Sequence, residues 1–317
     1  MVKSLIIVGA GQLGSRYLQG LFAVPSSLDI YVQDISQESL DRAKLRWEEV
    51  SMENSIHQVT FLQDFNKLPE EIDLAIISTT ANIRAKVVEV LSNVTKVNYW
   101  ILEKVLAQSP AEIDRLRAGI SKSKGAWVNT SRRMMNWHKE IKSNININSP
   151  LSLKVSGNNW GLASNSVHFL DMISWWTGET LLELDTSELE DSWFESKRPG
   201  YFEVFGNITA KFSGGSIAQL SSNDKSLPIR IEAVVDGLNW AIDEIAGHAS
   251  REDGMVINGG ITVQSELSSI LVKDISNDAC ELPTFEESAA LHTIVLNSLK
   301  THWDAQSSQQ SLILPIT

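Results

Sequence analysis

Six residues near the start of the chain form a glycine pattern directly after the first apolar run. Residues 9–14 are Gly-Ala-Gly-Gln-Leu-Gly and follow the run Leu-Ile-Ile-Val at 5–8. In the pattern G-x-G-x-x-G, the first glycine permits a tight turn, the second lets a pyrophosphate approach the backbone, and the third lets a helix pack on the strand. The new helix presents unpaired N–H groups to an anion. We expect five residues to contact a dinucleotide: Gly9, Gly11, Gln12, Leu13 and Gly14.

An acidic residue ends the next apolar run. Asp34 follows residues 28–33 and lies 20 residues after Gly14. A carboxylate at this position accepts hydrogen bonds from the adenosine ribose hydroxyls and repels a 2′-phosphate. Asp34 therefore favours NAD over NADP. The alternative is that Asp34 only begins the loop before the next helix.

The first 128 residues alternate short apolar runs with helical patterns. Strands are predicted at 4–8, 28–33, 58–62, 72–78, 99–102 and 126–129. Helices are predicted at 36–50 and 82–91, and a third begins with a capping box at 109–112. This alternation predicts a doubly wound parallel sheet of the Rossmann type, in which ligands bind beyond the carboxyl ends of the strands.

Polar residues follow two of these strands. Three residues after the strand at 72–78 are expected to contact ribose and phosphates, with a helix cap as the alternative role: Thr79, Thr80 and Asn82. The strand at 99–102 is followed by Glu103 and Lys104. We place Glu103 in the cofactor site and expect Lys104 to supply an acid or base beside the nicotinamide. A solvated ion pair is the alternative for these two residues.

After residue 129 the pattern changes to β-rich runs. Strands are predicted at 151–156, 202–212, 216–220, 229–235, 240–245 and 270–272. Gly214-Gly215 and Asp236-Gly237 are typical of hairpin turns, and few helices separate the runs. A large, open and mostly antiparallel sheet is expected, followed by a helix at 286–303.

We therefore divide the chain into two domains. Residues 1–128 form a dinucleotide-binding Rossmann domain, and residues 129–317 form an α+β domain for substrate binding and oligomerisation. The C-terminal helix and tail could pack back on the first domain.

Composition excludes several classes of partner. The net charge of −12 argues against nucleic acid, because phosphate neutralisation requires a basic surface. Cys280 is the only cysteine and the six histidines show no paired spacing, so neither a disulfide nor a metal is expected. No apolar run approaches the roughly 20 residues that span a bilayer, and no signal peptide is recognised. A cytoplasmic protein without a membrane partner is expected.

The ordered motifs resemble the glucose–fructose oxidoreductase/inositol dehydrogenase (Gfo/Idh/MocA) family over nearly the whole chain. The E-K-x-L-A and H-x-x-D patterns are more specific than the glycine pattern. The matching residues are Gly9–Gly14, Asp34, residues 79–82, Glu103-Lys104 with Leu106-Ala107, Trp160-Gly161, His168 to Asp171, and Trp176-Thr177-Gly178.

The resemblance implies a Rossmann domain and an open-sheet domain with the substrate between them. It implies oxidation of sugar or polyol hydroxyls, or reduction of the corresponding carbonyls, with NAD(P), and dimers or tetramers formed through the sheet domain. It also implies that Lys104 is the lysine of the E-K-P motif near the reacting oxygen. His168 would be the pocket histidine, as an acid/base or a substrate ligand.

The sequence departs from the family pattern at four positions. Val105 replaces the proline of E-K-P, so a cis peptide bond is not expected there. Ala81 and Ala85 replace the proline and histidine of the T-P-N-x-x-H turn. Ser164 stands four residues before His168, where many family dehydrogenases have aspartate. Serine can bind a sugar hydroxyl but cannot replace a carboxylate in tuning its neighbours, which questions efficient dehydrogenase chemistry but not cofactor binding.

Further residues in this region could bind the substrate. Asparagine can pair with hydroxyls, tryptophan suits the C–H face of a sugar, and arginine suits a carboxylate or phosphate. Asp171 shares a helix face with His168 and could orient its imidazole, or the two could be a structural pair. Trp160 could equally be a core aromatic, and Arg133 a brace. The substrate candidates are Asn159, Trp160, Ser164, Asn165, Asp171 and Arg133.

The leading hypothesis is an NAD-dependent oxidoreductase that acts on a sugar, sugar acid or nucleotide-linked sugar, in which Lys104 moves the hydroxyl proton, either with His168 or through water. A second hypothesis is a non-catalytic dinucleotide sensor or regulatory subunit on the same fold. A third is a reductase with an aromatic or tetrapyrrole-like substrate.

Overall fold

The computed structural model describes residues 1–51, 55–147, 149–225, 227–306 and 311–317. The chain divides into two units, each with its own sheet. The first unit contains residues 1–106, 111–131 and 262–285, and the second contains 107–110, 132–261 and 286–317. The first unit therefore includes a segment that follows most of the second unit in the sequence.

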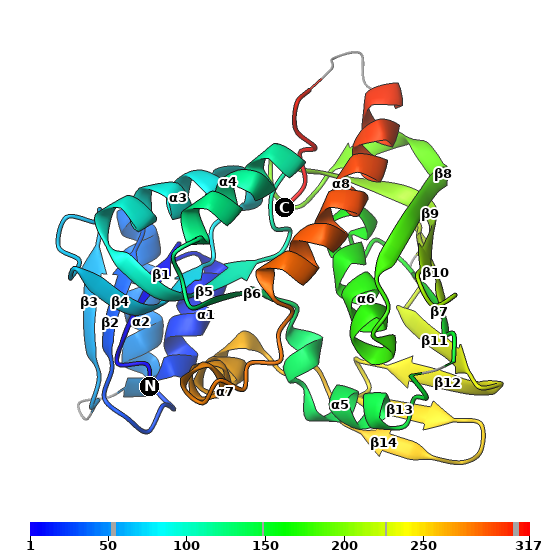
Figure 1. Cartoon of the computed structure of the whole chain (residues 1–317), viewed down its shortest axis with the longest axis horizontal. Coiled ribbons are helices and arrows are strands. Elements are labelled where there is room, and N and C mark those ends of the chain that lie inside the picture. Colours follow the sequence, from blue (N-terminus) through cyan, green and yellow to red (C-terminus); the bar gives the residue numbers. More distant parts are fainter. Residues whose placement is uncertain (52–54, 148, 226, 307–310) are drawn as a thin grey trace. The chain divides into compact units, whose positions relative to one another are not determined.

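The first unit has a six-stranded parallel sheet in the order β3-β2-β1-β4-β5-β6, which is the Rossmann order (Figure 1). The prediction of this sheet is confirmed, with strand boundaries that differ by at most three residues. The strands are β1 (Ser4–Val8), β2 (Asp29–Gln33), β3 (Gln58–Leu62), β4 (Glu71–Ile77), β5 (Lys96–Glu103) and β6 (Gly125–Asn129).

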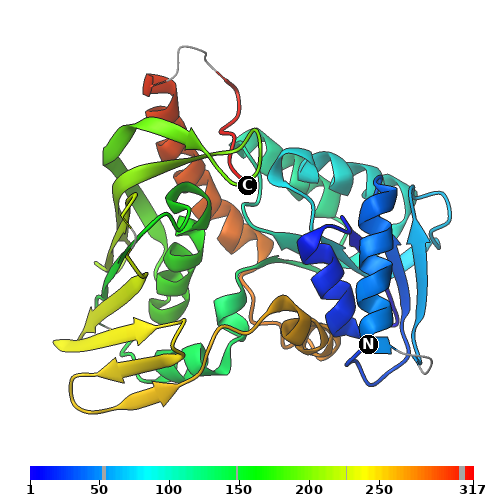
Figure 2. The same cartoon turned by 180° about the vertical axis from the view of Figure 1, so that it is seen from behind.

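Helices cover both faces of this sheet. Figures 1 and 2 show α1 and α2 on one face and α3 and α4 on the other. Residues 5–8 of β1 are at most 1% exposed. Since both faces of this strand are covered, its residues are apolar throughout instead of alternating with polar ones. The helices of the unit are α1 (Gln12–Leu21), α2 (Gln37–Ser51), α3 (Ala81–Val94), α4 (Pro110–Ile120) and α7 (Gln264–Ser276).

The prediction of a strand at 270–272 is wrong, because these residues lie within α7. Leu267, Leu271 and Ile275 are buried and recur at helical spacing. An apolar run of three residues cannot distinguish the period of a helix from that of a strand. The helix packs closely on α1, since a Cβ at Gly20 would lie 2.2 Å from the Ser265 carbonyl oxygen.

The second unit has an eight-stranded sheet in the order β14-β13-β12-β11-β7-β10-β9-β8. Its pairs are antiparallel except for β7 with β10, which confirms the expected open, mostly antiparallel sheet. The strands are β7 (Ser152–Gly157), β8 (Leu181–Glu195), β9 (Phe202–Phe212), β10 (Ile217–Ser222), β11 (Arg230–Val235), β12 (Leu238–Asp243), β13 (His248–Arg251) and β14 (Val256–Asn258).

The sequence prediction missed β8, β13 and β14, and two of these, β8 and β14, are edge strands. Acidic residues interrupt the apolar residues of β8, as is common where an edge strand must resist pairing with another chain. Both predicted hairpin turns are confirmed. Asp236 and Gly237 join β11 to β12 with φ of 54° and 75°, as a type I′ turn requires.

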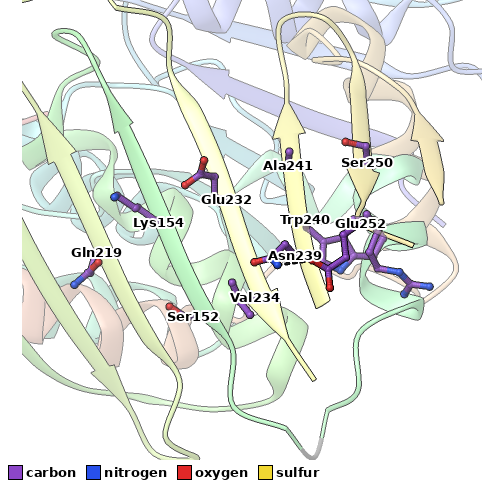
Figure 3. A pocket seen from close by; sticks show the side chains of 11 residues that line it. Ser152, Lys154, Gln219, Glu232, Val234, Asn239, Trp240, Ala241, Ser250 and Glu252 are labelled. Atoms are coloured by element: carbon purple, nitrogen blue, oxygen red, sulfur yellow. Dashed lines mark hydrogen bonds between the residues drawn. The ribbon is translucent and has the colours of Figure 1, made fainter. Parts of the chain in front are cut away.

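Helix α6 (Leu162–Thr177) packs on β9 and β10, and α8 (Phe285–Gln306) lies on the same side of the sheet (Figures 1 and 2). A short 3₁₀ helix, η1 (Ser131–Met134), and α5 (Asn136–Ser143) complete the unit. The other face of the sheet bears polar side chains such as Lys154, Gln219 and Glu232 (Figure 3). Of the helices within the described residues, none combines the length and apolar character needed to cross a bilayer.

Candidate functional site

The glycine turn lies between β1 and the first residue of α1. Gly9 has φ of +95°, and a Cβ at Gly14 would lie 1.8 Å from the Gly9 carbonyl oxygen, so both positions require glycine. A Cβ at Gly11 would meet no atom within 4 Å. Gly11 is also the N-cap of α1 and provides no side-chain hydrogen bond to it. The space beside Gly11 at the N-terminus of α1 is therefore open, as anion binding requires.

Asp34 follows β2 at the carboxyl end of the sheet, next to the glycine turn. Its Oδ2 accepts a hydrogen bond from the Ala10 amide at 2.7 Å, and its Oδ1 accepts one from the Ser36 amide at 2.9 Å. The carboxylate is therefore fixed by both the glycine turn and its own loop. Each oxygen has a second acceptor site, which suits a ribose hydroxyl.

Arg46 on α2 contacts the glycine turn, and sequence reasoning missed it. Its Nη2 donates to Gln12 Oε1 at 2.5 Å, and its Nη1 donates to the Gln12 carbonyl at 3.1 Å and to Ser15 Oγ at 2.5 Å. Burial, followed by the charges of Arg16 and Arg42, lowers the pKa of Arg46. Arg46 adjoins Gln12 in the structure but lies 34 residues away in the sequence, so no local motif could have identified it.

Thr79, Thr80 and Asn82 lie in the turn between β4 and α3. Thr80 is the N-cap residue of α3, but no side-chain hydrogen bond from it caps the helix. Its hydroxyl donates instead to Asn82 Oδ1 at 2.7 Å. The turn also adjoins the glycine motif, since a Cβ at Gly9 would lie 3.1 Å from the Thr79 nitrogen.

Glu103 ends β5 and is 6% exposed, so it is not part of a solvated ion pair. Its Oε1 accepts hydrogen bonds from Tyr17 at 2.5 Å and from Asn129 at 2.8 Å. Asn129 also donates to Gln264 on α7 at 2.9 Å. Burial raises the pKa of Glu103 more than these hydrogen bonds and the nearby charges of Arg84 and Lys104 lower it. Tyr17, Asn129 and Gln264 were not predicted, because they come from three distant parts of the chain.

Lys104 follows Glu103 and is half-buried. The Lys104–Val105 peptide bond is cis, which corrects the expectation drawn from the absence of proline. Val105 is fully buried, and its carbonyl oxygen accepts a hydrogen bond from Arg84.

In the second unit, a carboxylate lies beside Ser164, which sequence reasoning did not predict. Glu203 on β9 is 6% exposed, and its Oε2 accepts hydrogen bonds from the amides of Ala163 at 2.8 Å and Ser164 at 3.4 Å. The Ser164 hydroxyl donates to Glu203 Oε1. The sheet thus supplies a carboxylate to this turn of α6. The 39 residues that separate Ser164 from Glu203 explain why no spacing rule could find it.

Gly161 lies at the centre of this polar cluster. It has φ of +77°, and a Cβ there would meet Asn165 Nδ2 at 2.9 Å, Glu203 Oε1 at 3.0 Å and Ser164 Oγ at 3.1 Å. Three polar atoms of different side chains therefore converge on the face that glycine leaves open. Ser164 and Asn165, both predicted as substrate ligands, are brought together here.

Trp160 is 8% exposed and has the contacts of a core aromatic. Its Nε1 donates to the Ser221 carbonyl at 2.8 Å, and its ring packs edge-on against Phe169 at 5.4 Å between centroids. Its carbonyl oxygen accepts a hydrogen bond from Asn165 at 2.6 Å. Asn159, its neighbour in the sequence, is exposed.

Asp171 and Arg133, predicted separately as substrate ligands, bind each other. The guanidinium donates through Nε at 3.0 Å and Nη2 at 2.7 Å to the two carboxylate oxygens, and both side chains are at most 8% exposed. The pair connects η1 to α6. His168 lies one turn before Asp171 on α6 and is half-buried.

Arg132 makes a second bidentate pair, with Glu244, at 2.5 and 2.7 Å. The guanidinium lies 4.4 Å from the centre of the Phe169 ring. His138 also reaches Glu244, at 3.1 Å from Nε2. Burial alone would raise the pKa of Glu244, but Arg132 and His138 together hold it well below its usual range. Burial lowers the pKa of His138.

No metal site is evident among the described residues, because they contain no group of three His, Cys, Asp or Glu side chains placed to bind one ion. A scan against protein-family models finds no match, and a search of curated proteins finds none either.

Comparison with solved structures shows that the chain shares its fold with inositol dehydrogenases and a nucleotide-sugar dehydrogenase. Apo scyllo-inositol dehydrogenase from Lactobacillus casei matches with a TM-score of 0.69 and 16% identity, over 96% of this chain and 97% of that chain. UDP-N-acetylglucosamine 3-dehydrogenase GnnA from Acidithiobacillus ferrooxidans matches with a TM-score of 0.71 and 14% identity, over 96% and 99%. A third match is the L. casei enzyme with bound NAD(H) and scyllo-inositol, with a TM-score of 0.68 and 15% identity, over 97% and 98%.

Proposed function

We propose that this protein is an NAD-dependent oxidoreductase that acts on a hydroxyl group of a sugar or polyol. The observation on which this proposal rests is the arrangement at the carboxyl edge of the parallel sheet. The uncapped glycine turn and Asp34 follow β1 and β2, and Lys104 follows β5 at the same edge. All three follow parallel strands at the edge where Rossmann folds bind their ligands, which supports an anion site at the glycine turn, a ribose acceptor at Asp34 and an acid or base at Lys104.

NAD is the proposed cofactor. The open side of Gly11 and the first N–H groups of α1 would accept the pyrophosphate, and Asp34 would accept the ribose hydroxyls and repel a 2′-phosphate. Thr79, Thr80 and Asn82 would contact the remaining ribose and phosphate groups. NAD(H) bound to the L. casei neighbour of the same fold supports this choice.

The proposed chemistry divides between the cofactor and two side chains. When bound, NAD supplies the acceptor for the hydride. Lys104 takes the hydroxyl proton during oxidation and returns it during reduction, an assistance that contributes roughly 10²–10⁴-fold. His168 binds the substrate or shares the proton transfer. We retain Asn159 and Trp160 as further substrate-binding candidates.

The carboxylate beside Ser164 favours an enzyme over a non-catalytic sensor. In sequence, the absence of aspartate at this position argues for lost chemistry, but Glu203 provides a carboxylate bonded to the Ser164 hydroxyl. We propose that Glu203, Ser164 and Asn165 bind substrate hydroxyls. Arg133 and Asp171 would position α6, because their two hydrogen bonds already join this helix to η1.

The uncovered face of the second sheet is the proposed contact between copies of the chain. It contains a shallow depression of about 540 Å³, lined by side chains of β7, β10, β11, β12 and β13 (Figure 3). Lys154 and Glu232 are directly paired across β7 and β11, so opposite charges lie side by side. A two-fold contact could pair each charge with its opposite on the second copy.

The test combines cofactor binding with turnover. Calorimetry with NAD and NADP should show tighter binding of NAD, and a panel of sugars and polyols should reveal a substrate through NADH absorbance. Lys104→Ala should leave NAD affinity nearly unchanged and lower turnover at least about tenfold, because only the proton transfer is lost. Unchanged turnover would remove Lys104 from the mechanism, and NAD binding without turnover of any substrate would favour the sensor.

A further inference from the structure

Arg84 is a buried cation that joins two loops of the first unit. It lies on the first turn of α3 and is 1% exposed. Its Nη2 donates to the Thr79 carbonyl oxygen, in the turn that follows β4. Its Nη1 donates to the carbonyl oxygens of Val105 and of Leu106, the latter at 3.1 Å, in the segment that follows Lys104. One guanidinium therefore binds both segments.

A guanidinium in this position is costly unless its hydrogen bonds are made, because burial removes it from water. The planar fork of arginine can donate in several fixed directions at once, whereas a lysine ammonium is a single point at the end of a flexible chain. Bridging three carbonyl oxygens in two segments requires the fork. The charge of Arg84 also reaches Glu103, where it helps to lower a pKa that burial raises.

We propose that Arg84 is a positioning residue that fixes Lys104 relative to the turn at Thr79. This inference rests on the proposed function, in which that turn contacts NAD and Lys104 moves the proton. Arg84 is 1% exposed, so its proposed action is through the backbone carbonyl groups that it binds. It acts by holding the backbone at Thr79 and the backbone at residues 105–106 at a fixed separation.

We expect substitution of Arg84 to lower turnover much more than it weakens NAD binding. A misplacement of about 1 Å in a catalytic group can reduce the rate about 100-fold, whereas the glycine turn and Asp34 would still bind NAD. We therefore expect Arg84→Lys to reduce kcat by at least tenfold and to change the Kd for NAD by less than about threefold. Arg84→Gln should reduce kcat further.

The experiment measures kcat with a polyol that the wild type oxidises and the Kd for NAD by calorimetry. Each variant is assayed well below its own unfolding temperature, so that loss of fold does not contribute. Arg115→Lys is the matched control, because Arg115 lies on α4 and pairs at the surface with Glu89 of α3 at 2.6 Å. This control should keep both values. A folded Arg84→Lys variant with unchanged kcat would overturn the proposal, as would a loss of NAD affinity equal to the loss of kcat.

A second measurement separates this inference from the proposed function. The rate at which a small amine-acylating reagent modifies Lys104, read by peptide mass spectrometry, needs no turnover. Arg84→Lys and Arg84→Gln should change this rate at least threefold relative to wild type, while the rate at the surface residue Lys122 stays the same. If the wild type oxidises no substrate but this change occurs, the proposed function fails and Arg84 still positions Lys104. Equal rates in all proteins would contradict the role of Arg84.

Discussion

Glu103 in the first unit and Glu244 in the second are both largely buried, yet their pKa values shift in opposite directions. Glu103 accepts hydrogen bonds from the neutral groups of Tyr17 and Asn129, and burial raises its pKa. Glu244 accepts two hydrogen bonds from the guanidinium of Arg132 and lies 3.1 Å from a ring nitrogen of His138. These two partners outweigh the effect of burial and lower the pKa of Glu244.

The difference shows that the partner, rather than the depth of burial, sets the charge of a carboxylate. Neutral donors stabilise the charged form only partly, whereas a bidentate guanidinium compensates for lost hydration when the geometry is good. The lowered pKa of Glu244 keeps this carboxylate charged at neutral pH, so that with Arg132 it forms a charged brace.

The largest expected effect comes from removing Arg132, the cation that pairs with Glu244. Arg132→Met should reduce the free energy of unfolding of the second unit by about 3 kcal/mol or more, because Glu244 would remain buried without its main partner. Arg42→Met is the control, since its pair with Glu38 is exposed and should contribute less than about 1 kcal/mol. Urea unfolding followed by tryptophan fluorescence measures both. Equal losses would mean that Glu244 is hydrated in spite of its burial.

The next effect uses pH to distinguish the two carboxylates. The folded-state pKa of Glu103 is raised, so its contribution to stability is complete below pH about 4.5 and is lost as pH rises through the folded pKa. Glu103→Gln cannot ionise, so its stability relative to wild type should increase as pH rises from 4 to 8. Each unit of pKa shift corresponds to about 1.4 kcal/mol.

Glu244→Gln should show the opposite dependence in the same experiment. The folded-state pKa of Glu244 is lowered, so its contribution is complete above pH about 4.5 and is lost only as pH falls below that value. The variant should be destabilised by a constant amount from pH 5 to 8, and the deficit should shrink in more acidic solution. Parallel curves for the two variants would show that the neutral and charged partners act alike.

The sequence predicted which residues lie together better in the first unit than in the second, for a physical reason. The glycine turn, Asp34 and the turn at Thr79 follow strands, and parallel strands bring their carboxyl ends to one edge. Their positions along the chain therefore predict their neighbours in space. Arg46, Tyr17 and Asn129 could not be predicted in this way, because side-chain packing between helices and strands brings them to the site.

In the second unit, neighbours come from antiparallel pairing and from helix packing on a sheet. Ser164 and Asp171 were identified as polar residues of α6, but their partners Glu203 and Arg133 are 39 and 38 residues away. The apolar alternation of a strand shows which of its side chains are buried, but not which helix covers them. The sequence therefore identified Ser164 without Glu203, and it identified Asp171 and Arg133 without their pairing.

The smallest expected effect concerns His138, which shares Glu244 with Arg132. The ring is fully buried, and burial lowers its pKa below the unfolded value of about 6.5. Between the two pKa values, His138 is protonated in the unfolded chain but neutral in the folded protein. The protein therefore loses stability as pH falls from about 6.5 toward the folded pKa. His138→Gln should lessen that loss by about 1 kcal/mol or less and leave the pH dependence of Glu103→Gln unchanged, since Glu103 belongs to the other unit. Unfolding midpoints at pH 5.5 and 7.5 test this, and an undiminished acid loss would show that the Glu244 charge keeps the ring protonated in the folded protein.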